Sequence, residues 1–176
     1  MPGDIIGGVN HDTDRPAVYD AEDRVRRWAL TGRPVTVFGS TWDPEPLARF
    51  QDVAAVQRYV DQVLSHCLRT GRHTAAASVH VRVRARRGTT RAHYEALPPV
   101  IAVPAADGAA GWAMNEMVVL HELAHHLTPR AHHGPDFRAA FLDLLAATNH
   151  PVLSHLTQLA FLDAGLAPLE GANRGH

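Results

Sequence analysis

Apolar residues recur every three or four positions in five stretches of the chain, the spacing that places them on one face of an α-helix. In the second stretch, Val56, Val60 and Val63 share such a face with Cys67. A short helical piece is also expected to begin at Asp43, because an acidic residue followed by proline is a common helix start. The apolar pattern predicts helices over residues 16–31, 52–70, 112–128, 135–145 and 151–165.

Other stretches alternate between apolar and polar residues, as strands with one buried face do. Between residues 77 and 86, the side chains of Val79, Val81 and Val83 alternate with histidine and arginine. Shorter strands are expected over residues 35–41, 91–96 and 100–103. Helices combined with a few irregularly spaced strands favour an α+β fold, in which a small mixed β-sheet packs on helices.

The length of 176 residues fits one folded domain with a substantial core. Residues 1–15 are polar and glycine-rich, which predicts a flexible N-terminal arm. The domain itself is expected over residues 16–166, and a frayed tail over residues 167–176.

The formal net charge of −1 argues against a nucleic-acid partner for the chain as a whole. Arginines do cluster between residues 82 and 91, where they could form a patch for nucleic acid or for an acidic substrate. A solvated face of the sheet is the favoured interpretation, because the chain is close to neutral. The absence of lysine from the sequence excludes Schiff-base chemistry on a lysine side chain.

Cys67 is the single cysteine, which excludes a disulfide within the chain and suits a reducing compartment. No basic segment followed by an apolar run stands near Met1, so no signal peptide is expected. No apolar run approaches the length needed to span a bilayer. These features predict a cytoplasmic protein that is not associated with a membrane.

The candidate chemistry lies in the third expected helix, which contains His121-Glu122-Leu123-Ala124-His125. Residues four apart lie on the same face of a helix, so His121 and His125 can ligate one metal ion. Glu122 lies beside them, placed to accept a proton from a metal-bound water. A catalytic zinc site takes three protein ligands, and either His132 or His133 could supply the third.

The sequence contains 13 histidines, so this pattern could also be a solvated helix end or a set of hydrogen-bonded core histidines. Apolar residues surround the motif, however, and predict that its helix is buried. Two imidazoles and a carboxylate in a buried helix are costly without a partner such as a metal ion. The metal site is therefore the favoured interpretation.

The segments HELAHHL and HGPDF, the second of which begins at His133, resemble the SprT-like, minimal-zincin metallohydrolases. The preceding run WAMNEMVVL is similar to that of small bacterial metallohydrolases of about this length. The resemblance implies a zincin-like domain in which His121, His125 and His133 bind Zn²⁺ and Glu122 is the catalytic acid/base. The chain lacks the CxxC pair of the zinc ribbon in some SprT relatives, so their DNA-linked role does not carry over.

Two functions follow from the motif and the resemblance. The favoured one is a zinc-dependent metallohydrolase, specifically a metallopeptidase that acts on a peptide or protein substrate through a zinc-bound water. The alternative is a zinc-stabilised binding or regulatory module that does not turn over substrate. Glu122 favours the enzyme, because a purely structural site needs no base.

Two further residues have expected supporting roles. The candidate oxyanion stabilisers are Tyr94, His93, His126 and His132, but a packing or surface role is the favoured interpretation for each of them. Tyr94 is preferred among the four if its strand borders the cleft. Asp136 could accept a hydrogen bond from a ligand imidazole and fix its tautomer. An equally good interpretation is that Asp136 has no contact with a ligand and is simply an acidic residue at the start of a helix, favoured by the positive end of the helix dipole.

Overall fold

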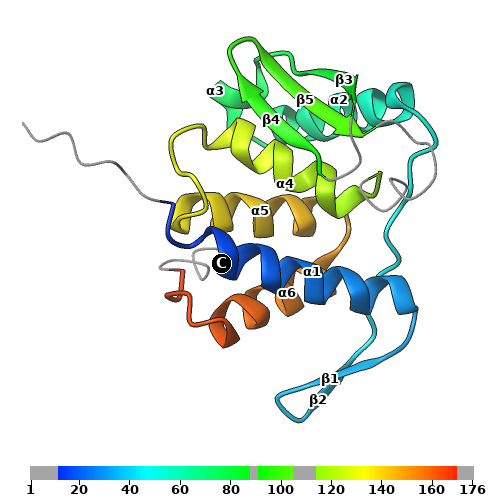
Figure 1. Cartoon of the computed structure of the whole chain (residues 1–176), viewed down its shortest axis with the longest axis vertical. Coiled ribbons are helices and arrows are strands. Elements are labelled where there is room, and N and C mark those ends of the chain that lie inside the picture. Colours follow the sequence, from blue (N-terminus) through cyan, green and yellow to red (C-terminus); the bar gives the residue numbers. More distant parts are fainter. Residues whose placement is uncertain (1–11, 88–90, 105–113, 170–176) are drawn as a thin grey trace, which may run out of the picture.

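Six helices and five strands form along residues 12–87, 91–104 and 114–169, the parts of the chain that the computed structural model describes. The fold is α+β, as predicted (Figure 1). The elements, in chain order, are α1 (Arg15–Thr31), β1 (Val35–Val37), β2 (Ser40–Trp42), α2 (Val53–Arg69), α3 (Thr74–Ala77), β3 (Arg82–Arg86), β4 (His93–Ala96), β5 (Pro99–Pro104), α4 (Glu116–Leu127), α5 (Pro135–Ala147) and α6 (Pro151–Asp163).

β5 is the central strand of a three-stranded mixed sheet. β3 pairs with it in parallel and β4 pairs with it antiparallel, so that Val83 and Tyr94 both lie opposite Ile101. β5 has a paired strand on each edge, and its residues from Val100 to Val103 are all buried. Both faces of the strand are therefore covered, which explains its unbroken apolar run. β1 and β2 form a separate antiparallel hairpin.

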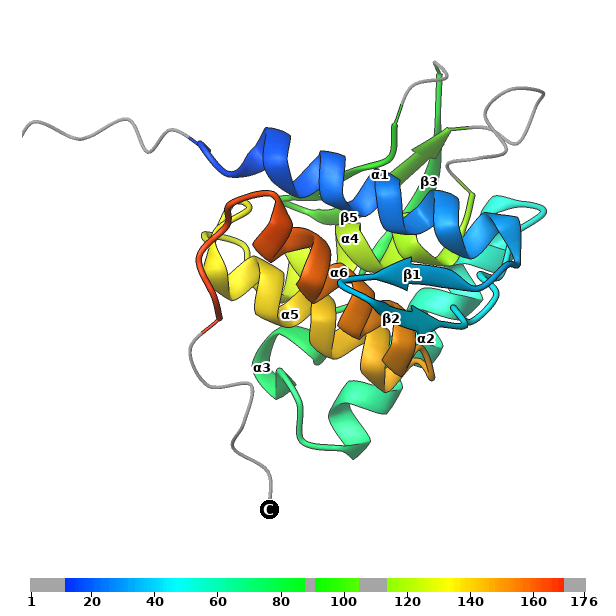
Figure 2. The same cartoon turned by 90° about the horizontal axis from the view of Figure 1, so that it is seen from below.

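Helix α4 lies between the sheet and the layer formed by α1, α5 and α6 (Figures 1 and 2). It contacts β4 and β5 on one side and α5 on the other. Ten of its twelve residues are buried, as expected for a helix that is apolar around most of its circumference. Any polar side chain on α4 therefore needs a partner inside the protein.

The start of α4 is fixed by the segment that follows the hairpin. The side chain of Asn115 accepts a hydrogen bond from the backbone of Val118 at 3.2 Å and caps the helix. Backbone hydrogen bonds also join Glu116 to Ala48 and Phe50 to Met114, at 3.0 and 2.8 Å. The predicted start of this helix at residue 112 is wrong, since the helix begins at Glu116; residue 112 itself lies outside the described residues.

The strand predicted over residues 77–86 begins only at Arg82. The preceding residues form the short helix α3 and a turn, and Val79 is exposed instead of lying on the buried face. Ala85 is exposed as well. The pairing explains the difference, because β5 first meets β3 where Val100 lies opposite Arg82.

The stretch from residue 35 to residue 41 is two short strands and not one. Phe38 and Gly39 form the turn between them, both with positive φ angles, 48° and 79°. The helical piece expected at Asp43 is absent from the structure. The carboxylate of Glu45 instead accepts hydrogen bonds from the backbone N–H groups of Val152 and Leu153 and so caps α6.

The predicted arm and tail fall largely outside the described residues, since residues 1–11 and 170–176 are not among them. Of the arm, Asp12 to Asp14 lead directly into α1. Within the described residues, no helix combines the length and the apolar character needed to cross a bilayer.

A buried carboxylate connects the N-terminus of α4 to α6. Glu116 accepts a hydrogen bond from the backbone of Ala48 at 2.9 Å, and its carboxylate lies 3.1 Å from Nε2 of His150. Burial alone would raise the pKa of Glu116, but the contacts with His150 and Ala48 lower it below the ordinary value. Since its pKa is lower in the folded state, the charged form of Glu116 stabilises the fold.

We therefore expect Glu116→Gln to lower the free energy of unfolding at pH 7 by roughly 1–3 kcal/mol. The contribution is complete above the unfolded-state pKa, near 4.5, and is lost as the pH falls through the lower folded-state value. Urea unfolding of the metal-free protein between pH 7 and pH 3 should show the two proteins converging in acid. Asp20→Asn, an exposed position of α1, is the control. A pH-independent difference would contradict this account.

Candidate metal centre

Three buried or half-buried histidines come together beside α4. His121 and His125 are one turn apart on the helix, and His133 reaches them from the turn before α5. One ring nitrogen from each lies within 4.8 Å of the other two. The protein thus has a three-histidine site that could hold a metal ion, built from the histidines identified in the sequence.

The turn before α5 selects His133 over its neighbour. His132 is exposed and has a positive φ angle of 48°, whereas His133 is buried. The N–H of Gly134 donates to the carbonyl of Ala131 at 2.9 Å and closes the turn. A side chain at Gly134 would place its Cβ only 3.1 Å from that carbonyl oxygen, so the tight turn favours glycine.

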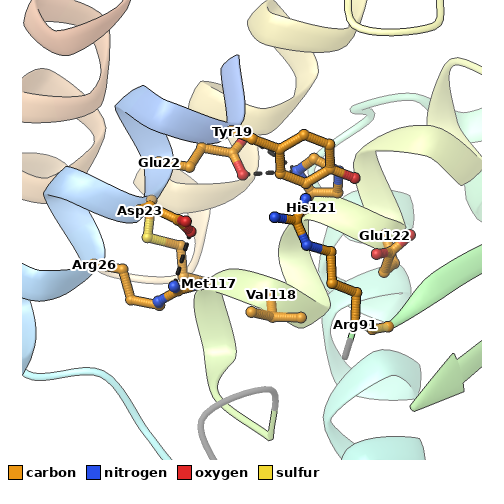
Figure 3. Close-up of a pocket in the computed structure, with 10 residues that line it drawn as sticks. Tyr19, Glu22, Asp23, Arg26, Arg91, Met117, Val118, His121 and Glu122 are labelled. Atoms are coloured by element: carbon orange, nitrogen blue, oxygen red, sulfur yellow. Dashed lines mark hydrogen bonds and ion pairs between the residues drawn. The ribbon is translucent and has the colours of Figure 1, made fainter. Parts of the chain in front are cut away.

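Two carboxylates fix the orientation of the histidine rings. Glu22 accepts from Nδ1 of His121 at 2.8 Å, and Asp12 accepts from Nδ1 of His133 at 2.6 Å. Figure 3 shows Glu22 directed from α1 towards His121. A proton on Nδ1 leaves the lone pair of each neutral imidazole on Nε2, the atom that faces the centre of the cluster.

The donor atoms fit a metal ion. The Nε2 atoms of His121 and His133 lie 3.4 Å apart, and each is an acceptor when Nδ1 carries the proton. Two such lone pairs repel unless a cation lies between them. In a tetrahedral zinc site with Zn–N distances near 2.05 Å, two nitrogens are about 3.4 Å apart, which agrees with the observed separation.

The sequence analysis did not identify Glu22 or Asp12. Both come from α1 or the residues just before it, more than 90 positions from the histidines that they contact. Glu22 did leave a signal in the sequence, because it stands beside Ala21 and four residues after Val18, on the apolar face of its helix. A carboxylate in such a position needs a buried partner. Asp12 left no comparable signal.

Aromatic rings surround the three histidines. Tyr19 stacks on His121 with ring centroids 5.1 Å apart, and its ring lies 5.2 Å from that of His133. Phe137 of α5 lies 4.4 Å from the ring of His125. These rings pack against the imidazoles and hold them in their orientation.

The pKa values of His125 and His133 suit metal binding, because a histidine must be neutral to ligate an ion. Burial, with a further contribution from His121 and His133, lowers the pKa of His125 to about 2, so this ring is neutral at pH 7. Burial also lowers the pKa of His133. Burial acts the same way on His121, but Glu22 raises the pKa of that ring above its ordinary value. A metal ion would have to displace any proton from Nε2 of His121.

Glu122 is buried next to the cluster, with 4% of its surface exposed. Burial raises its pKa, while the neighbouring His121 ring and a hydrogen bond from the backbone of Tyr94 act in the opposite direction. A cation on the histidines would also favour the charged form. A carboxylate whose pKa is moved towards neutrality can both take up and release a proton.

Glu122 opens onto two hollows. One is the pocket of Figure 3, where Glu122 lies with His121, Glu22 and Tyr19. The other is a surface cleft of about 400 Å³, which Glu122 lines together with His125 and His133. The candidate base and two of the histidines therefore face one solvent-accessible space, in which a ligand could meet them.

The hydroxyl of Tyr94 does not point freely into this cleft. It donates to Nδ1 of His126 at 3.0 Å, because Nε2 of that ring donates to the carbonyl of Ala76. Tyr94 and His126 thus join β4 to α4. The role of Tyr94 as an oxyanion stabiliser stays a prediction. His93 contacts Arg86 and Glu95 along the sheet.

Asp136 is exposed in the first turn of α5, where an acidic residue interacts favourably with the helix dipole. The carboxylates that contact His121 and His133 in the described residues are Glu22 and Asp12. The predicted contact between Asp136 and a ligand imidazole stays a prediction.

Comparisons with known proteins give no match: no family model, no curated protein and no solved structure is similar to the chain. The functional argument therefore rests on the geometry of the site.

His133→Ala should remove the bound metal, because it deletes one of the three ligands, whereas His132→Ala should leave the metal content unchanged. Elemental analysis of the purified variants measures this directly. Since the site joins α4 to the turn before α5, His133→Ala and chelation of the wild type should also lower the melting temperature. Full metal occupancy in His133→Ala would show that another residue completes the site.

Glu22→Gln should weaken metal binding about 10–100-fold, because the amide no longer fixes the His121 ring as a carboxylate does. Competition with a chromophoric chelator gives the affinity. Asp23→Asn is the matched control on the same helix, since the carboxylate of Asp23 pairs with Arg26. Equal affinities for the Glu22→Gln variant and the wild type would exclude a role for Glu22 in metal binding.

Proposed function

We propose that this chain is a zinc-dependent metallohydrolase that cleaves peptide bonds. The observation that carries the proposal is the position of Glu122, buried beside three histidines and lining the same cleft as two of them. A metal site that only stabilises the fold has no use for a buried carboxylate at an open cleft.

Zinc is the ion that this donor set suits best. Three imidazole nitrogens within 4.8 Å of one another, two of them 3.4 Å apart and oriented by carboxylates, are typical ligands of a catalytic zinc. Among the described residues, no fourth histidine, cysteine or carboxylate joins the group, so one position is left for a ligand from solution. Zinc in such a site supplies a Lewis acid that acidifies water and polarises a carbonyl group.

Glu122 would perform the proton transfers. Its carboxylate accepts a proton from the attacking water and then donates that proton to the nitrogen of the departing amine. The backbone N–H of Tyr94 holds the carboxylate in place during both steps. Tyr19 and Phe137 pack against the histidine rings and hold them in one orientation.

A peptide fits the surroundings of the cleft. β4 is an outer strand of the sheet, and its residues His93, Tyr94 and Ala96 line the cleft. An extended peptide can add to such a strand through backbone hydrogen bonds. The resemblance of the motifs around His121 and His133 to SprT-like metallohydrolases supports the same class of reaction.

Glu122→Gln should keep the fold and the zinc but lose about 10²–10⁴-fold in the rate of peptide cleavage. Glutamine is nearly isosteric with glutamate and cannot accept the proton. The measurement combines zinc analysis with cleavage of a random peptide library by the zinc-loaded protein.

Asp163→Asn, at the end of α6, is the control, because Asp163 pairs with Arg24 and lines neither of the hollows beside Glu122. The proposal fails if Glu122→Gln cleaves as fast as the wild type. It also fails if zinc-loaded wild type cleaves no peptide, denatured protein or simple ester, in which case a zinc-stabilised binding module is the better description.

A further inference from the structure

Two arginines from distant parts of the chain meet at the mouth of the candidate site. Arg15 begins α1, and Arg91 precedes β4. The guanidinium carbon of Arg91 lies 4.5 Å from the centre of the Tyr19 ring, and that of Arg15 lies 5.5 Å from it. Tyr19 itself stacks on His121, so the ring that both guanidinium groups approach also contacts the histidine cluster.

Both arginines face the space that Glu122 faces. Arg15 and Arg91 line the same surface cleft as Glu122, His125 and His133. Figure 3 shows the side chain of Arg91 extended across the pocket, with its guanidinium group beside Tyr19 and His121.

Neither guanidinium group has an anionic partner within the described residues, where no carboxylate lies within 4 Å of Arg15 or Arg91. The carboxylates near the cluster have other roles, since Asp12 binds His133 and Glu22 binds His121. Two positive charges beside one ring repel each other, and a bound cation would add to the repulsion. An anion from solution would relieve it.

Other arginines of the same stretch behave differently. Arg84 pairs with Glu95, and Arg86 donates to the carbonyl of Arg91 and contacts His93. Arg82 is exposed on β3. These three fit the solvated sheet face favoured by the sequence analysis, whereas Arg91 turns into the cleft. The acidic-substrate interpretation therefore applies to Arg91 together with Arg15, and not to the arginine run as a whole.

We propose that Arg91 and Arg15 bind a carboxylate of the substrate, so that the enzyme acts on peptides with an acidic group close to the scissile bond. This inference rests on the proposed hydrolase function and specifies its substrate. The ring distances keep the guanidinium carbon of Arg91 within about 10 Å of the His121 ring, a span of two to three residues of extended peptide. The carboxylate could belong to an aspartate or glutamate side chain or to the peptide C-terminus.

Binding tests the subsite separately from cleavage. The zinc-loaded Glu122→Gln protein is titrated with two fluorescent random peptide pools that differ only in glutamate or glutamine at one central position. A third pool carries glutamine at that position and a free C-terminal carboxylate in place of an amide. We expect one of the two acidic pools to bind at least about ten-fold more tightly than the neutral pool, and added salt to reduce the difference. The pool that shows the preference identifies the source of the carboxylate.

Adding Arg91→Met should bring the ratio of acidic to neutral binding close to one, because methionine keeps the apolar contact with Tyr19 and removes the charge. Arg15→Met should reduce the ratio as well. Arg82→Met is the matched control and should leave it unchanged. Equal binding of the acidic and neutral pools, or an unchanged ratio in Arg91→Met, would overturn the proposal.

The outcomes separate the two proposals. Cleavage by the wild type without any preference for acidic peptides would reject the carboxylate subsite and leave the hydrolase in place. Arg91-dependent binding of acidic peptides by a wild type that cleaves nothing would reject the hydrolase and leave a carboxylate-binding site beside the metal centre.

Discussion

The buried contact between Glu22 and His121 is the interaction on which the rest of the site depends. It joins α1 to α4 across 99 positions of sequence, and both side chains are almost fully removed from water. Removing either partner would leave a buried polar group without compensation, which is strongly destabilising. The contact also fixes which nitrogen of His121 faces the other histidines. One pair thus contributes to the docking of a helix and to the chemistry of the centre.

Helix α1 and the residues just before it make two further contacts with the histidine cluster. Asp12, just before it, orients His133, and Tyr19 on its second turn stacks on His121. Because α1 packs on α6, and α6 packs on α5, the orienting residues are held by a continuous set of helix contacts. The histidines are therefore positioned by rigid elements on both sides, which is what a pre-organised site requires.

Charge is distributed in an ordered way around this centre. The carboxylates of Glu22 and Asp12 lie behind the imidazoles of His121 and His133, where they accept hydrogen bonds from Nδ1 and leave Nε2 facing the other histidines. Arg15 and Arg91 lie at the cleft, where they face solvent and an incoming ligand. Negative charge behind the ligands raises their basicity towards a cation, and positive charge at the mouth favours an anionic substrate.

Features that depend on local residue spacing could be predicted from the amino-acid sequence. The four-residue repeat in the motif placed His121 and His125 on one face of α4, and its apolar neighbours predicted the burial of that helix. Gly134 and Pro135 predicted the start of α5 beside His133. The α+β class also followed from periodicity, because helix and strand periods are visible in a single stretch of chain.

Features that depend on a partner far along the chain could be seen only once the elements had packed together. The true start of β3 at Arg82 is set by where β5 lies beside it, and Glu45, two residues after the helix start expected at Asp43, instead caps α6. The roles of Glu22 and Arg91 likewise depend on packing, which brings the ring of His121 to Glu22 and the ring of Tyr19 to Arg91. Residue spacing specifies which side chains share one face of a helix or strand. Which other element those side chains contact depends on how the helices and the sheet pack together.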